Sequence, residues 1–279
     1  MPEGFRDRVA AAVEATGPLC AGIDPSRALL TAWGLPDDAS GLRAFGDICV
    51  EAFAGVVAVV KPQVAFFERH GSAGMAELER LITRASSAGL VVIVDAKRGD
   101  IDSTAEAYAD AWLAEDSPFA ADAVTVHPYL GLGALAPMVR LAGKSGRGVL
   151  VVARSSNPEG RVLQQAMTAE GTPVEDMLLR EIAALNTSGE VPTGTVGAVI
   201  GATLEPSTFP LSQLKGIILA PGLGAQGAGA EEVAERFRGC DPRTVLPSSS
   251  RGLLGAGPEP EKVRQEAQSL ARELSALMR

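Results

Sequence analysis

Charged residues gather in the segment DAKRGDI, residues 95–101, which directly follows an apolar run at 90–94. Positions two apart on an extended strand face the same side, so Asp95 and Lys97 are expected to project together. Lys61 ends the preceding apolar run, and adjacent strands lie about 4.8 Å apart, which brings Lys61 within reach of Asp95. The chain has only five lysines, and solubility does not explain why two of them stand at strand ends.

Lys61, Asp95 and Lys97 thus form a row of alternating charge, with Asp100 just beyond it. Each opposite neighbour favours the charged form of the group beside it. Burying such a row costs several kcal/mol per ion unless the pairs are well made, so stability alone is a weak explanation. An ammonium group held beside a carboxylate can donate a proton and can stabilise negative charge that develops on a substrate. The row therefore indicates an active site.

Two other interpretations of residues 95–101 are possible. The segment could be a solvated charged loop with no chemical role. The tripeptide Arg98-Gly99-Asp100 also matches a cell-adhesion signal, but the chain has no secretory features that would favour this role.

A second cluster of candidates lies near the C-terminus. Residues 222–227, GLGAQG, match the pattern G-x-G-x-x-G after an apolar run. A dinucleotide site would need an acidic residue about twenty positions on, at the end of the next strand, whereas Asp241 lies before that strand. Glycines that let backbone N–H groups approach an anion, together with Arg251 as a bidentate donor, favour a site for a single phosphate.

His70 and His127 are the only histidines, and no H-x-x-H pattern or Cys/His cluster surrounds them. A dedicated metal site is therefore not expected. His127 ends an apolar run, so a place in the pocket is possible, although a structural histidine with hydrogen-bonded ring nitrogens is the favoured interpretation. The two tryptophans and two tyrosines are interpreted as packing residues.

The elements that position these residues follow from short, mostly β-branched apolar runs alternating with helix-like stretches. The expected strands are 19–23, 56–60, 90–94, 123–126, 149–153, 196–200, 217–220 and 245–246. The expected helices are 42–53, 75–85, 103–113, 132–141, 174–185, 230–237 and 259–278, with a reduced connection around 204–214. Eight such units predict a single (β/α)8 TIM barrel over residues 1–279, whose site lies at the carboxyl ends of the strands. Residues 157–173 form the longest irregular connection and are a candidate loop or lid.

Composition limits the partners of this chain. Twenty-five basic and 34 acidic residues give a formal net charge of −9, which argues against nucleic acid and against an anionic membrane surface as partners. Three widely spaced cysteines give neither a disulfide framework nor a zinc site. The sequence lacks a signal peptide pattern and any long apolar span, so a soluble cytoplasmic protein is expected.

The segment at 95–101 closely resembles the D-x-K-x-x-D-I signature of the orotidine 5′-phosphate decarboxylases, and in length the chain is similar to the longer bacterial branch of that family. The likeness continues in order along nearly the whole chain, at GIDP (22–25), KP (61–62), SSNP (155–158), PGLGAQG (221–227) and SRG (250–252). The short signature alone is shared with sugar-phosphate relatives, whereas all the segments together are strongly specific.

The resemblance implies that Lys61, Asp95, Lys97 and Asp100 form a charged tetrad. Asp100 would reach into the active site of a partner subunit, which makes a homodimer the expected assembly. Thr104, one helical turn on, would contact the ribose of the ligand in that partner.

The resemblance also implies the substrate contacts. Asp24 would bind ribose hydroxyls with help from Lys61, and Ser156 would hydrogen-bond the pyrimidine, although Ser155 could take that place if the alignment moves by one residue. Gln226 and Arg251 would bind phosphate. The remaining residues of this expected binding site are Pro221, Gly224 and Gly252. His127 departs from the family pattern that the resemblance implies, in which Asn is expected before Pro128.

The implied reaction is loss of CO2 from C6 of orotidine 5′-phosphate to give uridine 5′-phosphate, with Lys97 as proton donor and no metal or organic cofactor. Asp95 would lie against the departing carboxylate. One alternative is a related barrel that decarboxylates or condenses a sugar phosphate with Mg²⁺. Another is a nucleotide-binding protein without catalysis, which would not need the whole tetrad.

Overall fold

The computed structural model describes residues 3–204, 208–224 and 229–278. Eight parallel strands pair in chain order and close into a barrel, as the alternation of apolar runs predicts. The strands are β1 (Cys20–Ile23), β2 (Val59–Pro62), β3 (Val91–Arg98), β4 (Ala123–Val126), β5 (Gly148–Arg154), β6 (Val196–Ile200), β7 (Ile218–Pro221) and β8 (Val245–Ser249). The prediction of a (β/α)8 barrel is confirmed.

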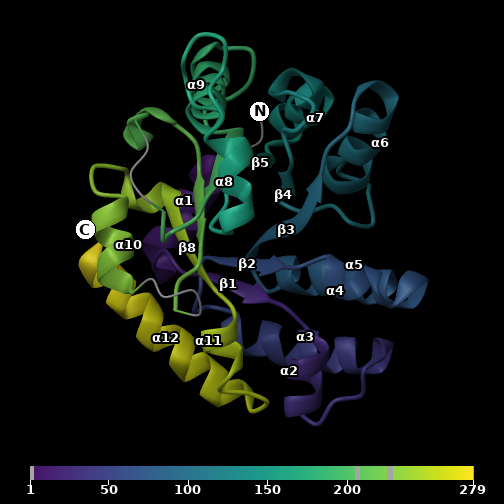
Figure 1. Cartoon of the computed structure of the whole chain (residues 1–279). Helices are drawn as coiled ribbons and strands as arrows, with labels where there is room; N and C mark the ends of the chain where they lie inside the picture. Colours follow the sequence, from purple (N-terminus) through teal and green to yellow (C-terminus); the bar gives the residue numbers. More distant parts are fainter. Residues whose placement is uncertain (1–2, 205–207, 225–228, 279) are drawn as a thin grey trace.

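Helices surround the strands (Figure 1). The α-helices are α1 (Phe5–Thr16), α2 (Arg27–Ala32), α3 (Ala39–Phe53), α4 (Ala65–Glu68), α5 (Gly71–Ser87), α6 (Asp102–Leu113), α7 (Ala136–Ser145), α8 (Arg161–Gln164), α9 (Val174–Thr187), α10 (Ala230–Arg236), α11 (Arg251–Leu254) and α12 (Pro260–Leu277). Short 3-10 turns are η1 (Leu132–Leu135), η2 (Pro158–Gly160), η3 (Leu211–Gln213) and η4 (Pro242–Thr244). Among the described helices, none has the length and apolarity needed to cross a membrane.

The core has two parts because alternate strand residues face opposite sides. One set, which includes Val60, Val92 and Val124, packs outward against the helices. The other set points into the barrel, where α1 packs against it through Phe5, with Val9 and Val13. The fit is tight: a Cβ on Gly148 of β5 would lie 2.2 Å from the Phe5 ring. Helix α1 therefore closes the amino-terminal end of the barrel, and the site must lie at the other end.

Three local expectations were wrong or incomplete. Helix α1 was not predicted. Helix α6 begins at Asp102, one residue before the predicted start at 103. Residues 157–173 are not wholly irregular, because they contain η2 and α8. The reduced sixth connection is confirmed for its described part, which holds only η3.

Candidate active site

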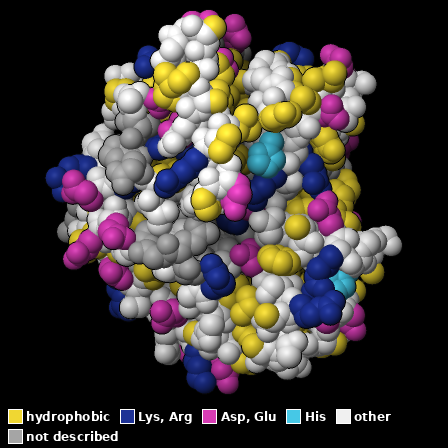
Figure 2. All heavy atoms as spheres, viewed as in Figure 1, with side chains coloured by type: hydrophobic (Ala, Val, Ile, Leu, Met, Phe, Trp, Pro, Cys, Tyr) yellow, Lys and Arg dark blue, Asp and Glu magenta, His cyan; other side chains and the backbone are white. Residues whose placement is uncertain are grey.

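The inward-facing residues of the barrel change from apolar to polar as the strands approach their carboxyl ends. On β2 the inward position after Val59 is Lys61, and on β3 the position after Ile93 is Asp95. Basic and acidic side chains accordingly gather near the centre of the face in Figure 2, which is viewed as in Figure 1. The period-two alternation of the strands thus delivers both charges to one place.

Asp95 lies at the centre of this polar group and its carboxylate accepts four hydrogen bonds. Lys61 Nζ and Gln63 Nε2 donate to Oδ2 over 3.1 and 2.9 Å. Lys97 Nζ and the Thr125 hydroxyl donate to Oδ1 over 2.5 and 2.8 Å. A carboxylate offers about four acceptor positions, so these donors use its hydrogen-bonding capacity. The predicted row of Lys61, Asp95 and Lys97 is present in the structure.

The row is electrostatically stable despite its burial. Burial by itself would raise the pKa of Asp95, but the charges of Lys61 and Lys97 outweigh burial and hold that pKa well below its usual range. Burial likewise opposes the charge of Lys61, yet the carboxylates of Asp95 and Asp24 raise the pKa of Lys61 above its usual value. Both groups are therefore ionised at neutral pH.

The two lysines differ in exposure and in backbone geometry. The side chain of Lys61 is 9% exposed and that of Lys97 is 40% exposed. Lys97 adopts φ +48°, a left-handed conformation that costs a non-glycine residue energy. Its backbone N–H donates to the Thr125 hydroxyl over 3.0 Å, and the pairing of β3 with β4 is irregular between Val94 and Arg98. These contacts aim Lys97 toward the barrel mouth, whereas Lys61 is held inside.

The pair of Lys61 and Asp95 should stabilise the fold independently of pH near neutrality. A lowered carboxyl pKa contributes stability that is complete above the unfolded value of about 3.9, and a raised lysine pKa contributes stability that is complete below about 10.4. The difference in unfolding free energy between the wild type and a Lys61→Met/Asp95→Asn variant should stay constant from about pH 5 to 9. Urea unfolding at several pH values measures it. A difference that falls steadily within this window would contradict the assignment of charges. Below about pH 4 the contribution of Asp95 should decrease.

A cavity of about 340 Å³ adjoins the row at Lys61 and reaches the carboxyl ends of β7 and β8. Its lining includes Asp24, Lys61, Pro221, Ser250 and Arg251. Within the described part of the chain, Asp24 Oδ1 and Ser250 Oγ are buried without a hydrogen-bond partner. Unpaired buried polar atoms are costly, and they are placed to bind the hydroxyl groups of a ligand. The cavity therefore has the groups of a polar ligand site, next to the charged row.

The glycines proposed for phosphate approach lie around this cavity. Gly222, which lines it, and Gly224 adopt φ of +113° and +78°, a region that favours glycine. Gly252 follows Arg251 at the start of α11, and Arg251 is exposed. Gln226, the other expected phosphate ligand, lies outside the described residues.

Asp100 and Thr104 do not join the row within this chain. The Asp100 carboxylate accepts a hydrogen bond from the Ile101 N–H over 2.8 Å, and no ion pair of Asp100 is found among the described residues. Thr104 is exposed in the first turn of α6. Their action across an interface stays a prediction.

Ser155 and Ser156 have different surroundings. Ser155 is hydrogen-bonded to Gln164 of α8 through both its backbone N–H and its hydroxyl. The Cβ of Ser156 instead lies 3.2 Å from where a Cβ on Gly201 would stand, at the end of β6. Ser155 is thus held by α8 and Ser156 lies against the end of β6, and Ser156 as the pyrimidine contact stays a prediction.

The favoured interpretation of His127 was wrong. His127 is exposed, and within the described residues its ring takes part in no hydrogen bond, so it is not a buried structural histidine. Partial burial and then the positive charge of Lys97 lower the pKa of His127, against the effect of Asp95. The imidazole ring of His127 is therefore neutral at neutral pH.

Sequence reasoning missed two groups that hold Asp95. Thr125 is fully buried on β4 and bridges Asp95 to the backbone of Lys97. Its signal was a single hydroxyl in the otherwise apolar strand AVTV. Gln63 directly follows Lys61 and Pro62, and nothing in its local pattern marks its contact with β3.

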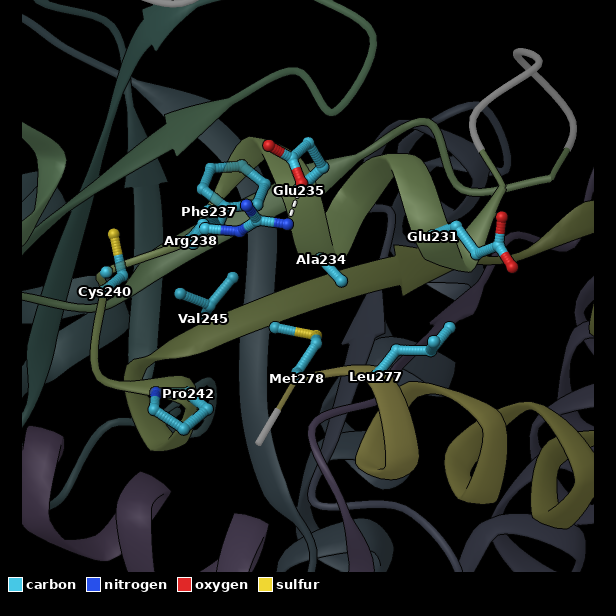
Figure 3. A pocket seen from close by; sticks show the side chains of 11 residues that line it. Glu231, Ala234, Glu235, Phe237, Arg238, Cys240, Pro242, Val245, Leu277 and Met278 are labelled. Atoms are coloured by element: carbon cyan, nitrogen blue, oxygen red, sulfur yellow. Dashed lines mark hydrogen bonds and ion pairs between the residues drawn. The ribbon is translucent and has the colours of Figure 1, made fainter.

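A second cavity among the described residues has different chemistry. A cavity of about 360 Å³ lies between α10 and α12, at the amino-terminal end of β8. Figure 3 shows Arg238 paired with Glu235 there, while the Glu231 carboxylate points away from them. No group of three or more His, Cys, Asp or Glu residues is placed to hold a metal ion in the described ranges.

Comparison with known proteins agrees with the geometry at the barrel mouth. Residues 17–266 match the model of the orotidine 5′-phosphate decarboxylase / HUMPS family. The chain is 49% identical over 276 residues to an orotidine 5′-phosphate decarboxylase of Salinispora arenicola, covering 99% of each protein. It is 48% identical over 273 residues to one of Streptomyces coelicolor, covering 98% of this chain and 97% of the relative.

Solved structures give the same result. A crystal structure of a Streptomyces avermitilis protein provisionally named orotidine 5′-phosphate decarboxylase superposes with a TM-score of 0.94 at 48% identity, covering 99% of this chain and 96% of the other. The OMP decarboxylase of Leishmania donovani superposes with a TM-score of 0.76 at 26% identity, covering 99% of both chains. The chain therefore belongs to the orotidine 5′-phosphate decarboxylase / HUMPS family.

Proposed function

We propose that this chain decarboxylates orotidine 5′-phosphate to uridine 5′-phosphate, a step of pyrimidine nucleotide synthesis. The bond between C6 and the carboxylate carbon breaks, CO2 leaves, and the electron pair remains on C6. One proton must then reach C6, so the net change is orotidine 5′-phosphate plus H⁺ to uridine 5′-phosphate plus CO2. The observation that carries the proposal is the buried Asp95 carboxylate held between Lys61 and Lys97 at the barrel mouth.

Lys97 supplies the proton in this mechanism. Its side chain is the more exposed of the two lysines that contact Asp95, and its ammonium group can approach a ligand while it remains bonded to Asp95. A positive charge at this place stabilises the electron pair that develops on C6 before the proton moves. Asp95 fixes the direction of Lys97 and lies against the departing carboxylate. Lys61, which is buried and charged, balances Asp95 and faces Asp24.

The hydrogen bonds of Asp95 argue for this charge-based mechanism over a magnesium-dependent one. Four donors already occupy the two carboxylate oxygens, two of them ammonium groups. A cation bound to Asp95 would have to displace these donors and stand close to two positive charges. The same residues are well suited to oppose a carboxylate and to protonate a carbanion.

The cavity beside the row accommodates the rest of the nucleotide. Asp24, with its buried unpaired oxygen, accepts hydrogen bonds from the ribose hydroxyls, and Lys61 takes part in binding the same hydroxyls. Arg251 and Gln226 bind the phosphate, with Pro221, Gly224 and Gly252 allowing the backbone to approach it. Ser156 binds the pyrimidine. Binding energy from the phosphate, far from C6, serves to order the site around the reacting carbon.

The active assembly is a homodimer in this proposal. Asp100 stands on the exposed connection after β3 and Thr104 in the first turn of α6. The connection after β3 approaches the one after β4, because a Cβ on Gly99 would lie 2.5 Å from the His127 carbonyl oxygen. The same two connections expose three large apolar side chains: Ile101 is 51% exposed, Tyr129 78% and Leu130 53%. A second copy of the chain would cover them and receive Asp100 and Thr104. We also propose that residues 1–279 form one domain that works in the cytoplasm.

A turnover assay with EDTA present tests the proposal. The protein is dialysed against EDTA and mixed with orotidine 5′-phosphate, and the loss of the orotate absorbance is followed. Turnover that is insensitive to EDTA is the expected result. Activity that requires added Mg²⁺, or turnover of a sugar phosphate in place of the nucleotide, would assign the chain to another chemistry. Binding of uridine 5′-phosphate without consumption of orotidine 5′-phosphate would indicate a binding protein.

A further inference from the structure

Gln164 of the short helix α8 is bonded to Ser155 through both polar atoms of its side chain. The Ser155 N–H donates to Gln164 Oε1 over 3.0 Å, and Gln164 Nε2 donates to the Ser155 hydroxyl over 2.7 Å. The orientation of the amide follows from this pattern, because a backbone N–H requires an oxygen as partner. The Ser155 hydroxyl then donates to Asn157 Oδ1 over 2.6 Å. The start of the connection after β5 is thus folded back on α8.

The other side of this segment is anchored to the barrel. Arg154, the last residue of β5, is 3% exposed, and its Nε lies 3.0 Å from Glu175 of α9. Its carbonyl accepts a hydrogen bond from the Gly201 N–H over 2.9 Å. Ser155 and Ser156 therefore lie between a rigid anchor at Arg154 and the tether at Gln164.

The tether has a consequence for Ser156, the next residue along the chain. Ser156 packs so closely at the end of β6 that a side chain on Gly201 would stand 3.2 Å from its Cβ. The N–H that Ser155 donates to Gln164 belongs to the Arg154–Ser155 peptide, so the two bonds to Gln164 fix this peptide and the Ser155 side chain, from which the chain continues to Ser156. The place from which Ser156 departs, beside the end of β6, is coupled in this way to the position of α8.

We propose that Gln164 is a positioning residue, which orients Ser156 toward the pyrimidine ring and couples this contact to the connection that carries α8. The inference rests on the proposed function, in which Ser156 binds the ring. Gln164 itself touches Ser155 and not the substrate. The apolar side chains of Val162 and Leu163 on the same helix are exposed, so α8 contributes little to the core and its loss should cost little overall stability.

The neighbouring residue Gln165 gives a matched control, because it has the same side chain on the same segment, is exposed and has no side-chain hydrogen bond among those of the described residues. The test compares wild type, Gln164→Ala, Gln165→Ala, Ser156→Ala and Ser156→Ala/Gln164→Ala. We expect Gln164→Ala to lower kcat/KM for orotidine 5′-phosphate about tenfold, the effect of losing one or two net hydrogen bonds, with an unchanged thermal midpoint. Gln165→Ala should remain within about twofold of wild type.

The double variant separates positioning from a structural effect. If Gln164 acts through Ser156, the double variant should be no slower than Ser156→Ala alone, because the two changes remove one function. Additive losses, or a Gln164→Ala enzyme equal to wild type, would overturn the inference. The dissociation constant of uridine 5′-phosphate, measured by calorimetry in the same five proteins, gives a readout independent of turnover. Absence of turnover in the wild type would contradict the proposed function, whereas the same coupling pattern in product binding would still support the role of Gln164.

Discussion

Replacement of Lys97 by Ala is expected to abolish decarboxylation while the protein remains folded. The substitution removes the proposed proton donor and the charge that stabilises the electron pair on C6, and each effect is worth about 10²–10⁴ in rate. A loss of at least 10⁴-fold in kcat is expected. Steady-state assays with high enzyme concentrations measure it. Lys144→Ala, an exposed lysine on α7, is the matched control and should retain the activity of the wild type.

Lys97→Gly separates chemistry from backbone strain. Lys97 has φ +48°, which alanine must also adopt at cost but glycine adopts freely. The glycine variant should therefore be more stable than the alanine variant by about 1 kcal/mol and equally inactive. Urea unfolding of the two variants gives the comparison. Decarboxylation by either variant at more than a few per cent of the wild-type rate would exclude Lys97 as the proton donor.

Asp95→Asn should lower both stability and activity. Lys61 is buried against this carboxylate with a side chain only 9% exposed, so removal of the negative charge leaves a buried ammonium without its partner. Breaking a buried pair in this way costs about 3–5 kcal/mol. Activity should fall with it, since Lys97 loses the hydrogen bond that directs it. Chemical denaturation and kcat measured on the same preparation report the two effects.

The double variant Lys61→Met/Asp95→Asn distinguishes an unpaired charge from general damage to the barrel. An apolar side chain of similar length removes the buried charge, so the double variant should recover much of the stability lost by Asp95→Asn alone. Its activity should stay lost. A double variant less stable than Asp95→Asn would mean that Lys61 contributes packing or hydrogen bonds that do not depend on Asp95, contrary to the charge-pair account.

The sequence predicted the barrel well because strand signals in a parallel sheet are local. Strands β4 and β6 begin and end at the predicted residues, since each is a short apolar run between polar connections. Helix α1 was missed for a physical reason. Its buried face is a narrow stripe of Phe5, Val9 and Val13 between polar residues, and the surface it covers is the end of the barrel, which forms only when all strands have closed.

The charged row was predictable for a similar reason, because period-two alternation places Asp95 and Lys97 on one side of β3. The local pattern did not reveal the irregular pairing of β3 with β4, the left-handed conformation of Lys97, or the hydroxyl of Thr125 that holds it. These features depend on the register between β3 and β4. The role of His127 was misjudged because burial of a side chain at a strand end is set by the connections around it. The strand pattern carries no signal for Asp100 and Thr104, since their proposed ligand contacts lie in a second subunit.

The central claim is that this barrel mouth removes the C6 carboxylate of orotidine 5′-phosphate without a metal. The most direct test uses orotidine 5′-phosphate labelled in that carboxylate and the EDTA-treated wild-type protein, and measures label in released CO2 together with uridine 5′-phosphate formed. The account predicts one labelled CO2 for each uridine 5′-phosphate, at an unchanged rate with or without EDTA. Label that stays in the nucleotide, or release that begins only after Mg²⁺ is added, would contradict it.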